Sequence, residues 1–340
     1  MSRFMNNFNS LDTEKFLLIN EMPEEKYSIE ARVEVKSAKF SFGSTNILKD
    51  INLTLYAGEI YGLLGANGAG KTTLMKAISG RLELDAGEIN VNCENPIFNQ
   101  SLRSSVGYIP QDIAIFPYLT IRENLEIFGI LSGVSKTSIT HVVENFLIKA
   151  SLQARSNQIC RDLSGGYQRR VNICASILNS PPVIILDEPT VGIDVDAREA
   201  IHWLLRDLRD NGAAILISTH DLDQAQSLCD RIGVLSNGVI AAEGAPKKLI
   251  SDYFGNYKEI VFILESELSD IEIHSLLNIG LNATQSSMVW LGWSEQPNFD
   301  IVEKSQDIER AGIKIKEIRI HSPDLSSLFK NIMANTRQPS

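Results

Sequence analysis

Residues 65–72 read Gly-Ala-Asn-Gly-Ala-Gly-Lys-Thr, a glycine-rich segment that ends in a lysine and a threonine. The segment fits the pattern G-x-x-x-x-G-K-[ST], in which backbone N–H groups wrap around phosphate oxygens. Lys71 would add a point charge, and Thr72 would offer its hydroxyl to Mg²⁺. The apolar run 60–64 predicts a strand before the loop, and residues 73–79 predict a helix after it. We therefore predict a nucleoside triphosphate site, whose binding residues are Gly65, Ala66, Asn67, Gly68, Ala69, Gly70, Lys71, Thr72 and Thr73.

Two adjacent carboxylates, Asp187 and Glu188, follow the apolar run 183–186. A run without polar alternation is typical of a strand that is covered on both faces, and such a strand would deliver both acids to the sheet edge. Adjacent carboxylates suggest separate tasks. Asp187 would hold Mg²⁺, and Glu188 would accept a proton from the attacking water, a role worth about 10² to 10⁴ in rate. The alternative is a pair of solvated acids at a strand end.

A third segment lies between the glycine-rich loop and the acidic pair. Residues 163–170 read Leu-Ser-Gly-Gly-Tyr-Gln-Arg-Arg. Ser164 is expected to cap the helix that follows, and Gly165 and Gly166 would present bare N–H groups to an anion. Taken alone, the segment would be read as a serine-capped helix without a ligand.

The order of these segments resembles that of ATP-binding cassette (ABC) proteins, and the resemblance covers about residues 31–250. Residues 163–167 are similar to the signature LSGGQ of that family, with Tyr167 in place of its glutamine. The resemblance implies that Leu163, Ser164, Gly165, Gly166 and Tyr167 contact the ATP held by another subunit.

The resemblance also assigns roles to single residues. Gln111 matches the Q-loop glutamine, which reaches the Mg²⁺ and the attacking water, so the implied metal ligands are Thr72, Gln111 and Asp187. Asp194 matches the D-loop aspartate at the dimer interface, and His220 matches the histidine that contacts the γ-phosphate. Glu188, His220 and Gln111 are thus the expected catalytic residues. Phe42 is the expected platform for adenine, with Phe40 close by as the alternative and simple packing as another.

Alternating apolar runs and amphipathic stretches would position these side chains. The runs 183–186 and 213–217 predict strands, and residues 201–208 between them carry apolar side chains at helical spacing. Asp187, Glu188 and His220 directly follow these runs, at the carboxyl edge of a parallel sheet where ligands gather. The predicted fold class is α/β, a P-loop ATPase domain of the ABC type with a helical signature subdomain, plus a small C-terminal α+β domain.

We divide the chain into an N-terminal extension (residues 1–30), the nucleotide-binding domain (31–250) and an accessory domain (251–340). In the accessory domain, strands are predicted at 259–264, 288–291 and 313–320. Helices are predicted at 271–277 and 301–308, with a last helix from about residue 324.

The composition excludes several classes of protein. Thirty-two basic against forty-two acidic residues give a net charge of −10, which argues against a protein that coats nucleic acid. The four cysteines form no C-x-x-C pair, so they are expected to be reduced and mostly buried. The apolar runs fall short of the roughly 20 residues that cross a bilayer, and no secretory signal is indicated.

The family resemblance implies a function for the chain. ATP would be held between the P-loop of one subunit and the signature segment of another, in a homodimer or with a paired cassette subunit. The ATPase would drive integral membrane permease subunits from the cytoplasmic face of the plasma membrane, as a peripheral protein that binds no nucleic acid. Residues 322–329 resemble the terminal segment of drug, sodium, lipid and polysaccharide exporter cassettes, which favours export. The alternative is a soluble ABC ATPase that acts as a regulatory switch on ribosomes or DNA.

Overall fold

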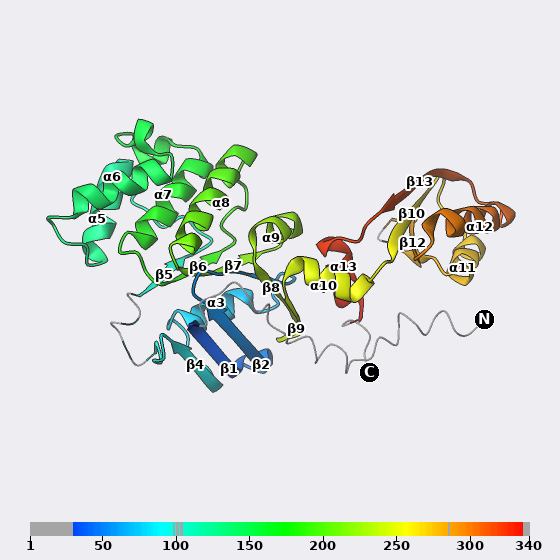
Figure 1. Ribbon diagram of the computed structural model, residues 1–340, viewed down its shortest axis with the longest axis horizontal. Coiled ribbons are helices and arrows are strands. Elements are labelled where there is room, and N and C mark those ends of the chain that lie inside the picture. Colours follow the sequence, from blue (N-terminus) through cyan, green and yellow to red (C-terminus); the bar gives the residue numbers. More distant parts are fainter. Residues whose placement is uncertain (1–29, 98, 100–101, 103–104, 285, 336–340) are drawn as a thin grey trace. The chain divides into compact units, whose positions relative to one another are not determined.

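The computed structural model describes residues 30–97, 99, 102, 105–284 and 286–335 (Figure 1). These residues form two compact units, a larger one up to Pro246 and a smaller one from Lys247. The domain boundary predicted at residues 250–251 falls inside helix α10 (Pro246–Phe254). None of the described helices is both long and apolar enough to cross a bilayer.

A six-stranded sheet lies at the centre of the larger unit, in the order β5-β6-β7-β3-β8-β9. The first five strands are parallel, and β9 pairs antiparallel with β8. Their bounds are β3 Ile60–Leu64, β5 Val106–Ile109, β6 Val183–Asp187, β7 Ala214–Thr219, β8 Arg231–Ser236 and β9 Val239–Gly244. Every residue of β3, β6 and β7 is buried, which is why these strands are continuous apolar runs. The predicted parallel sheet is confirmed.

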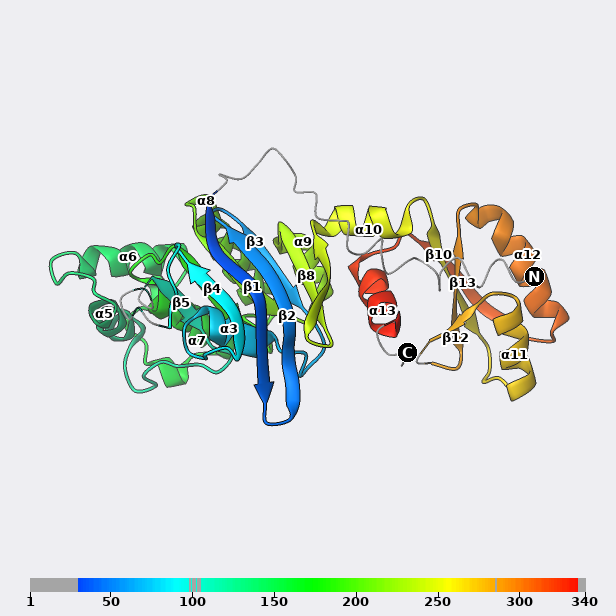
Figure 2. The same cartoon turned by 90° about the horizontal axis from the view of Figure 1, so that it is seen from below.

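A second, three-stranded antiparallel sheet has the order β2-β1-β4, with β1 Ala31–Phe42, β2 Thr45–Tyr56 and β4 Ala86–Val91. Helix α3 (Lys71–Ile78) lies between the two sheets (Figures 1 and 2), and its buried Leu74 and Met75 belong to one apolar core with side chains of both sheets. Within this larger unit the sequence predicts only the parallel sheet, so the antiparallel sheet is an addition.

Helices cover the other face of the six-stranded sheet. Those in contact with it are α7 (Gly165–Ile177), α8 (Val195–Asp210) and α9 (Leu222–Leu228). Two more helices, α5 (Ile121–Leu131) and α6 (Ile139–Lys149), precede α7, and α5 packs against both α6 and α7. Short 3-10 turns at Gln153–Arg155 and Cys160–Asp162 lead into α7. This is the helical signature subdomain that the sequence predicts.

The smaller unit is a four-stranded antiparallel sheet in the order β11-β12-β10-β13. Its elements are β10 Lys258–Leu264, α11 Asp270–Asn278, β11 Asn282–Ala283, β12 Val289–Ser294, α12 Pro297–Arg310, β13 Ile315–His321 and α13 Leu325–Asn335. Phe262 and Trp290 of the sheet pack with Leu276 of α11 and Ile308 of α12, so the two helices cover one face. The sequence predicts the order of the elements from β10 onward, except the two-residue β11, and it does not predict the helix α10 that precedes them.

Candidate active site

The glycine-rich loop connects β3 to α3, and its backbone shape depends on glycine. Gly70 is the N-cap residue of α3, with φ of 106°, a left-handed conformation that other residues rarely adopt. Gly65 has no room for a side chain, because a Cβ there would lie 2.6 Å from the carbonyl oxygen of Leu235. The loop therefore aims the first N–H groups of α3 at one small volume, as an anion site requires.

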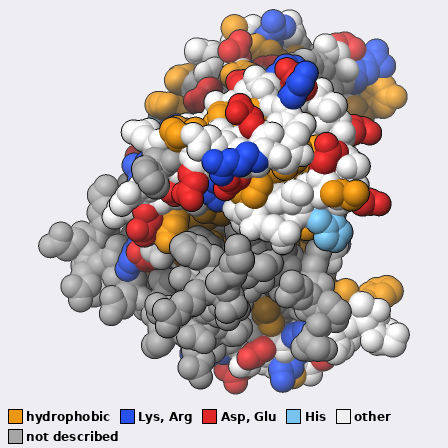
Figure 3. Space-filling model, turned by 90° about the vertical axis from the view of Figure 1, so that its right-hand side faces the viewer, with side chains coloured by type: hydrophobic (Ala, Val, Ile, Leu, Met, Phe, Trp, Pro, Cys, Tyr) orange, Lys and Arg blue, Asp and Glu red, His pale blue; other side chains and the backbone are white. Residues whose placement is uncertain are grey.

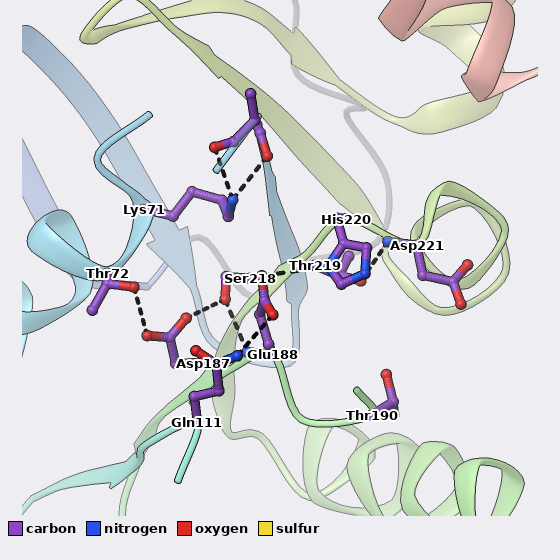
Figure 4. Close-up of polar contacts among 12 residues, drawn as sticks. Lys71, Thr72, Gln111, Asp187, Glu188, Thr190, Ser218, Thr219, His220 and Asp221 are labelled. Carbon is purple, nitrogen blue, oxygen red and sulfur yellow. Dashed lines mark hydrogen bonds and ion pairs between the residues drawn. The ribbon is translucent and has the colours of Figure 1, made fainter. Parts of the chain in front are cut away.

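Lys71 turns back into this loop. Its Nζ donates to the carbonyl oxygens of Gly65 (2.8 Å) and Ala66 (3.2 Å), as Figure 4 shows. Burial lowers the pKa of Lys71, while the negative charges of Glu188 and Asp187 oppose that shift. The ammonium is thus a buried positive charge beside the N-terminus of α3.

Asp187 ends β6 and receives hydrogen bonds from two neighbouring elements. Thr72 Oγ1 at the start of α3 donates to Asp187 Oδ2 (2.7 Å), and Ser218 Oγ on β7 donates to Asp187 Oδ1 (2.6 Å) (Figure 4). The register of the parallel sheet places Ser218 directly beside Asp187. The side chain of Asp187 is thereby held at the carboxyl edge of the sheet, next to the glycine-rich loop.

The donor set at this edge fits Mg²⁺. Thr72 and Asp187 offer adjacent hydroxyl and carboxylate oxygens, the hard ligands that Mg²⁺ prefers. No group of three or more His, Cys, Asp or Glu side chains arranged for a metal occurs in the described part of the chain. A site with so few protein ligands suits an ion that keeps several waters and binds phosphate oxygens as well.

Glu188 has a backbone conformation that is unusual for its residue type. Its φ is +46°, in the left-handed region that residues with a side chain adopt only rarely. Gln111 Nε2 donates to Glu188 Oε2 (3.2 Å), and His220 Nδ1 lies 3.4 Å from Glu188 Oε1. The backbone N–H of Glu188 donates to Ser218 Oγ (2.9 Å), which holds the turn. Three catalytic residues expected from the sequence thus lie together at one strand edge.

Arg169, on the first turns of α7, is a residue that the sequence analysis does not single out. Its guanidinium is buried and donates to backbone carbonyls of Pro110 (2.6 Å), Gln111 (3.0 Å), Asp187 (3.0 Å) and Pro189 (3.0 Å). Burial lowers the pKa of Arg169 to about 10, so the group stays charged at neutral pH. One side chain of the signature helix therefore ties together the backbones that carry Gln111 and Glu188.

Gln224, on α9, is a second residue near the site that the sequence does not identify. Its Oε1 accepts from Thr190 Oγ1 (2.9 Å) and Thr219 Oγ1 (2.8 Å), and its Nε2 lies 2.9 Å from Nε2 of the buried His202. Thr190 stands two residues after Glu188, and Thr219 directly precedes His220. The side chains of Gln224, its two threonine partners and His202 are all buried. Gln224 therefore links the segment that follows Glu188 to the segment that precedes His220.

We expect Gln224→Ala to lower the free energy of unfolding by about 1–3 kcal/mol, because two buried hydroxyls lose their shared acceptor. ATP hydrolysis should fall while ATP affinity stays within about twofold, since no phosphate-binding residue changes. Urea denaturation and steady-state kinetics measure the two effects. Gln226→Ala, an exposed glutamine on the same helix, is the matched control. Wild-type stability in Gln224→Ala would contradict the network.

The signature residues lie at the start of α7. Ser164 occupies the N-cap position but its side chain makes no capping hydrogen bond, so the predicted cap is wrong. Its hydroxyl is exposed instead, as is Gly165, while Leu163 is buried. Gly166 faces α8, where a Cβ would lie 2.6 Å from the Cβ of Ala197. Close helix packing is therefore a second reason for glycine at this position.

Tyr167 and Asp194 flank the signature glycines. The ring of Tyr167 lies between the guanidinium groups of Arg155 and Arg170, with centroid distances of 4.7 and 4.2 Å, and their hydrogen bonds lower its pKa. Asp194 caps α8 by accepting from the backbone N–H of Ala197 (2.9 Å). A Cβ built on Gly166 would stand 3.6 Å from Asp194 Oδ2, so the two predicted interface segments are neighbours within one chain.

The two candidate phenylalanines for adenine differ in exposure. Phe42, at the end of β1, is 79% exposed, while Phe40 packs on the core. Simple packing, the alternative considered for Phe42, is therefore wrong, and Phe42 remains the candidate for a stacking surface.

Comparisons with known proteins agree with this geometry. A family model described as "ABC transporter" matches residues 48–191. The chain is similar to the Nod factor export ATP-binding protein I of Burkholderia lata, with 39% identity over 66% of this chain and 74% of that protein. The protein of the same name from Bradyrhizobium diazoefficiens is 38% identical over 66% of this chain and 73% of its own length.

Solved structures are similar in the same region. An ATP-binding subunit of an ABC transporter superposes with a TM-score of 0.60 and 31% identity, over 66% of this chain and 93% of the other. A dimeric ATP-binding cassette in a post-hydrolysis state, bound to ADP and Pi, superposes with a TM-score of 0.56 and 28% identity, over 63% of this chain and 98% of the other. The similarity thus covers the larger unit in both sequence and structure.

Proposed function

Because this chain belongs to the ABC transporter family, as the ATP-hydrolysing subunit of an exporter-type transporter, we propose that two cassettes clamp ATP between them to move separate membrane subunits. The transport function replaces the alternative of a switch on ribosomes or DNA, since the relatives are named for export. The observation that carries the proposal is the meeting of two groups of side chains at one sheet edge. Thr72 bonds to Asp187 there, Gln111 and His220 contact Glu188, and Lys71 lies in the adjacent glycine-rich loop.

In this proposal the triphosphate of ATP lies in the loop 65–73, with Lys71 between its phosphates and Phe42 stacked on adenine. The exposed Ser164 and Gly165 of a second cassette close on the γ-phosphate from the opposite side. Asp194 lies at the same interface. The second cassette is another copy of this chain or a paired cassette subunit, because each chain supplies one half of a site.

Glu188 accepts the proton of the attacking water in our scheme, while Gln111 and His220, which already contact its carboxylate, orient the water and the γ-phosphate. Thr72, Asp187 and Gln111 would hold Mg²⁺, which supplies charge neutralisation on the phosphate oxygens. Once the γ-phosphate is cleaved, the ligand that bridges the two cassettes is lost and the interface loosens.

We infer that the surface after Gln111 contacts the membrane subunits. Phe116 and Tyr118 are 45% and 73% exposed there, and Ile113 is 40% exposed. Phe116 also stacks on Phe128 of α5 at 5.4 Å, so the patch is anchored to the helical subdomain. If Gln111 shifts when the γ-phosphate is bound or lost, this exposed patch would pass the shift on to the helices of the membrane subunits. In this scheme the cassette lies at the cytoplasmic face of the plasma membrane, and the membrane subunits select the cargo.

Affinity purification of the tagged chain from detergent-solubilised membranes tests the proposal. We expect an integral membrane protein to co-purify, and Phe116→Ala combined with Tyr118→Ala to reduce its recovery while ATP binding is preserved. An exposed aromatic elsewhere on the same unit, Trp203→Ala on α8, is the control. Recovery of ribosomes or DNA without any membrane protein would overturn the transport function.

A further inference from the structure

Strand β13 lies at an edge of the sheet in the smaller unit. Its only strand partner among the described residues is β10, so its second row of backbone N–H and C=O groups faces outward. Such an edge is a template for another strand. Natural edge strands are often protected by charged side chains, and β13 carries four titratable residues in seven.

Two charged residues of β13, Glu317 and Arg319, lie on the face opposite to the one that α11 and α12 cover. The register places Glu317 opposite Ile263 and Arg319 opposite Val261 on β10. These two partners are not part of the core that α11 and α12 cover, which contains Ile260, Phe262 and Leu264 instead. Within one chain, Arg319 Nε lies 2.7 Å from Glu317 Oε1, with their side chains 60% and 46% exposed.

We propose that β13 pairs antiparallel with β13 of a second copy of this chain, about a twofold axis at Ile318. The sequence of the strand, Ile-Lys-Glu-Ile-Arg-Ile-His, is self-complementary about this residue. In that register Glu317 of each copy lies directly opposite Arg319 of the other, and the two Ile318 side chains meet. Residues directly opposite each other share one face of the sheet, so these ion pairs form twice.

Other registers are opposed by the same charges. A shift by one residue in one direction sets Lys316 opposite Arg319. A shift by two sets Glu317 opposite Glu317, or Arg319 opposite Arg319. Like charges directly opposite each other destabilise a strand pair. The charged residues of β13 therefore disfavour the shifted registers and favour the register centred on Ile318.

A second copy is the partner that these features favour. An isologous contact with a twofold axis needs a self-complementary surface, which this strand provides. Nucleic acid and anionic membranes would instead need a surface that is predominantly positively charged. On the face shown in Figure 3, acidic and basic side chains intermingle over the described residues instead. The pairing would join two four-stranded sheets into one continuous sheet.

Sedimentation of the full-length protein without nucleotide tests the pairing, separately from any association that ATP drives. We expect a monomer–dimer equilibrium in the wild type. Arg319→Glu and Glu317→Arg should each raise the dissociation constant by about tenfold or more, because both ion pairs become like-charge pairs. Lys316→Glu, opposite Ile320 in the proposed register, is the matched control and should change the constant by about twofold at most.

Mixing the two single variants separates the contact between copies from the ion pair within one chain. An equimolar mixture of Arg319→Glu and Glu317→Arg should form heterodimers with near wild-type affinity, since opposite charges again face each other across the axis. The double variant E317R/R319E should dimerise with itself. Hydrogen exchange should slow in β13 as the wild-type concentration rises. A monomeric wild type, single variants that associate normally, or a mixture as dissociated as its components would overturn the proposal.

Discussion

Glu188→Gln is expected to slow ATP hydrolysis by about 10² to 10⁴ and to leave ATP binding intact. The amide keeps the shape of the side chain and a carbonyl oxygen for Gln111, which donates to Glu188 at 3.2 Å. It cannot take a proton from water. ATP that is bound but not cleaved should therefore hold two cassettes together. Turnover is measured by phosphate release, and the dimer by light scattering with ATP and Mg²⁺.

The control for this variant is Glu83→Gln, which neutralises an exposed carboxylate of the same unit. It should hydrolyse ATP at the wild-type rate and show no stable dimer. Normal turnover in Glu188→Gln would remove Glu188 from the proposed mechanism. A variant that is inactive yet remains monomeric with ATP would separate hydrolysis from dimerisation and count against the clamp.

Lys71→Ala is expected to abolish turnover by weakening both ATP binding and the stabilisation of the reacting phosphate. The ammonium is buried at the bend of the loop, within hydrogen-bond distance of Gly65 and Ala66 carbonyls. A charged hydrogen bond is worth about 1.5–3 kcal/mol, which corresponds to an ATP affinity lowered about ten- to hundredfold. Equilibrium binding of a fluorescent ATP analogue and phosphate release measure the two losses.

Lys76→Ala provides the comparison, because Lys76 is exposed in the last turn of the same helix. It removes one positive charge from α3 without touching the loop, so both affinity and turnover should stay near the wild type. If Lys71→Ala hydrolysed ATP normally, the loop 65–73 would not be the triphosphate site.

The residues that the sequence identified correctly as neighbours are those tied to strand ends. Asp187 ends the buried strand β6 and His220 directly follows the buried strand β7. Parallel strands bring their carboxyl ends to one edge, so the proximity of the two residues follows from the order of the elements. Glu188 adds a positive φ that no sequence pattern predicts. The glycine-rich loop is a local motif that the sequence identifies by its spacing, although the room it needs is set by contacts such as that of Gly65 with Leu235.

The residues that the sequence did not reveal act across the fold. Arg169 contacts carbonyls from two separate segments, 110–111 and 187–189, and Gln224 joins two threonines that are far apart in the chain. Ser218 could have been found, because the register of two adjacent strands pairs it with Asp187. The contacts of Arg169 and Gln224 could not have been found in this way. They depend on how α7 and α9 pack on the sheet, which residue spacing does not specify.

The most direct test of the account is the structure of Glu188→Gln with ATP and Mg²⁺ bound. We predict two copies facing head to tail, with Ser164 Oγ of one copy within hydrogen-bond distance of the γ-phosphate that lies in the loop 65–73 of the other. A γ-phosphate contacted only by residues of its own chain, with Ser164 of the second copy facing elsewhere, would contradict it.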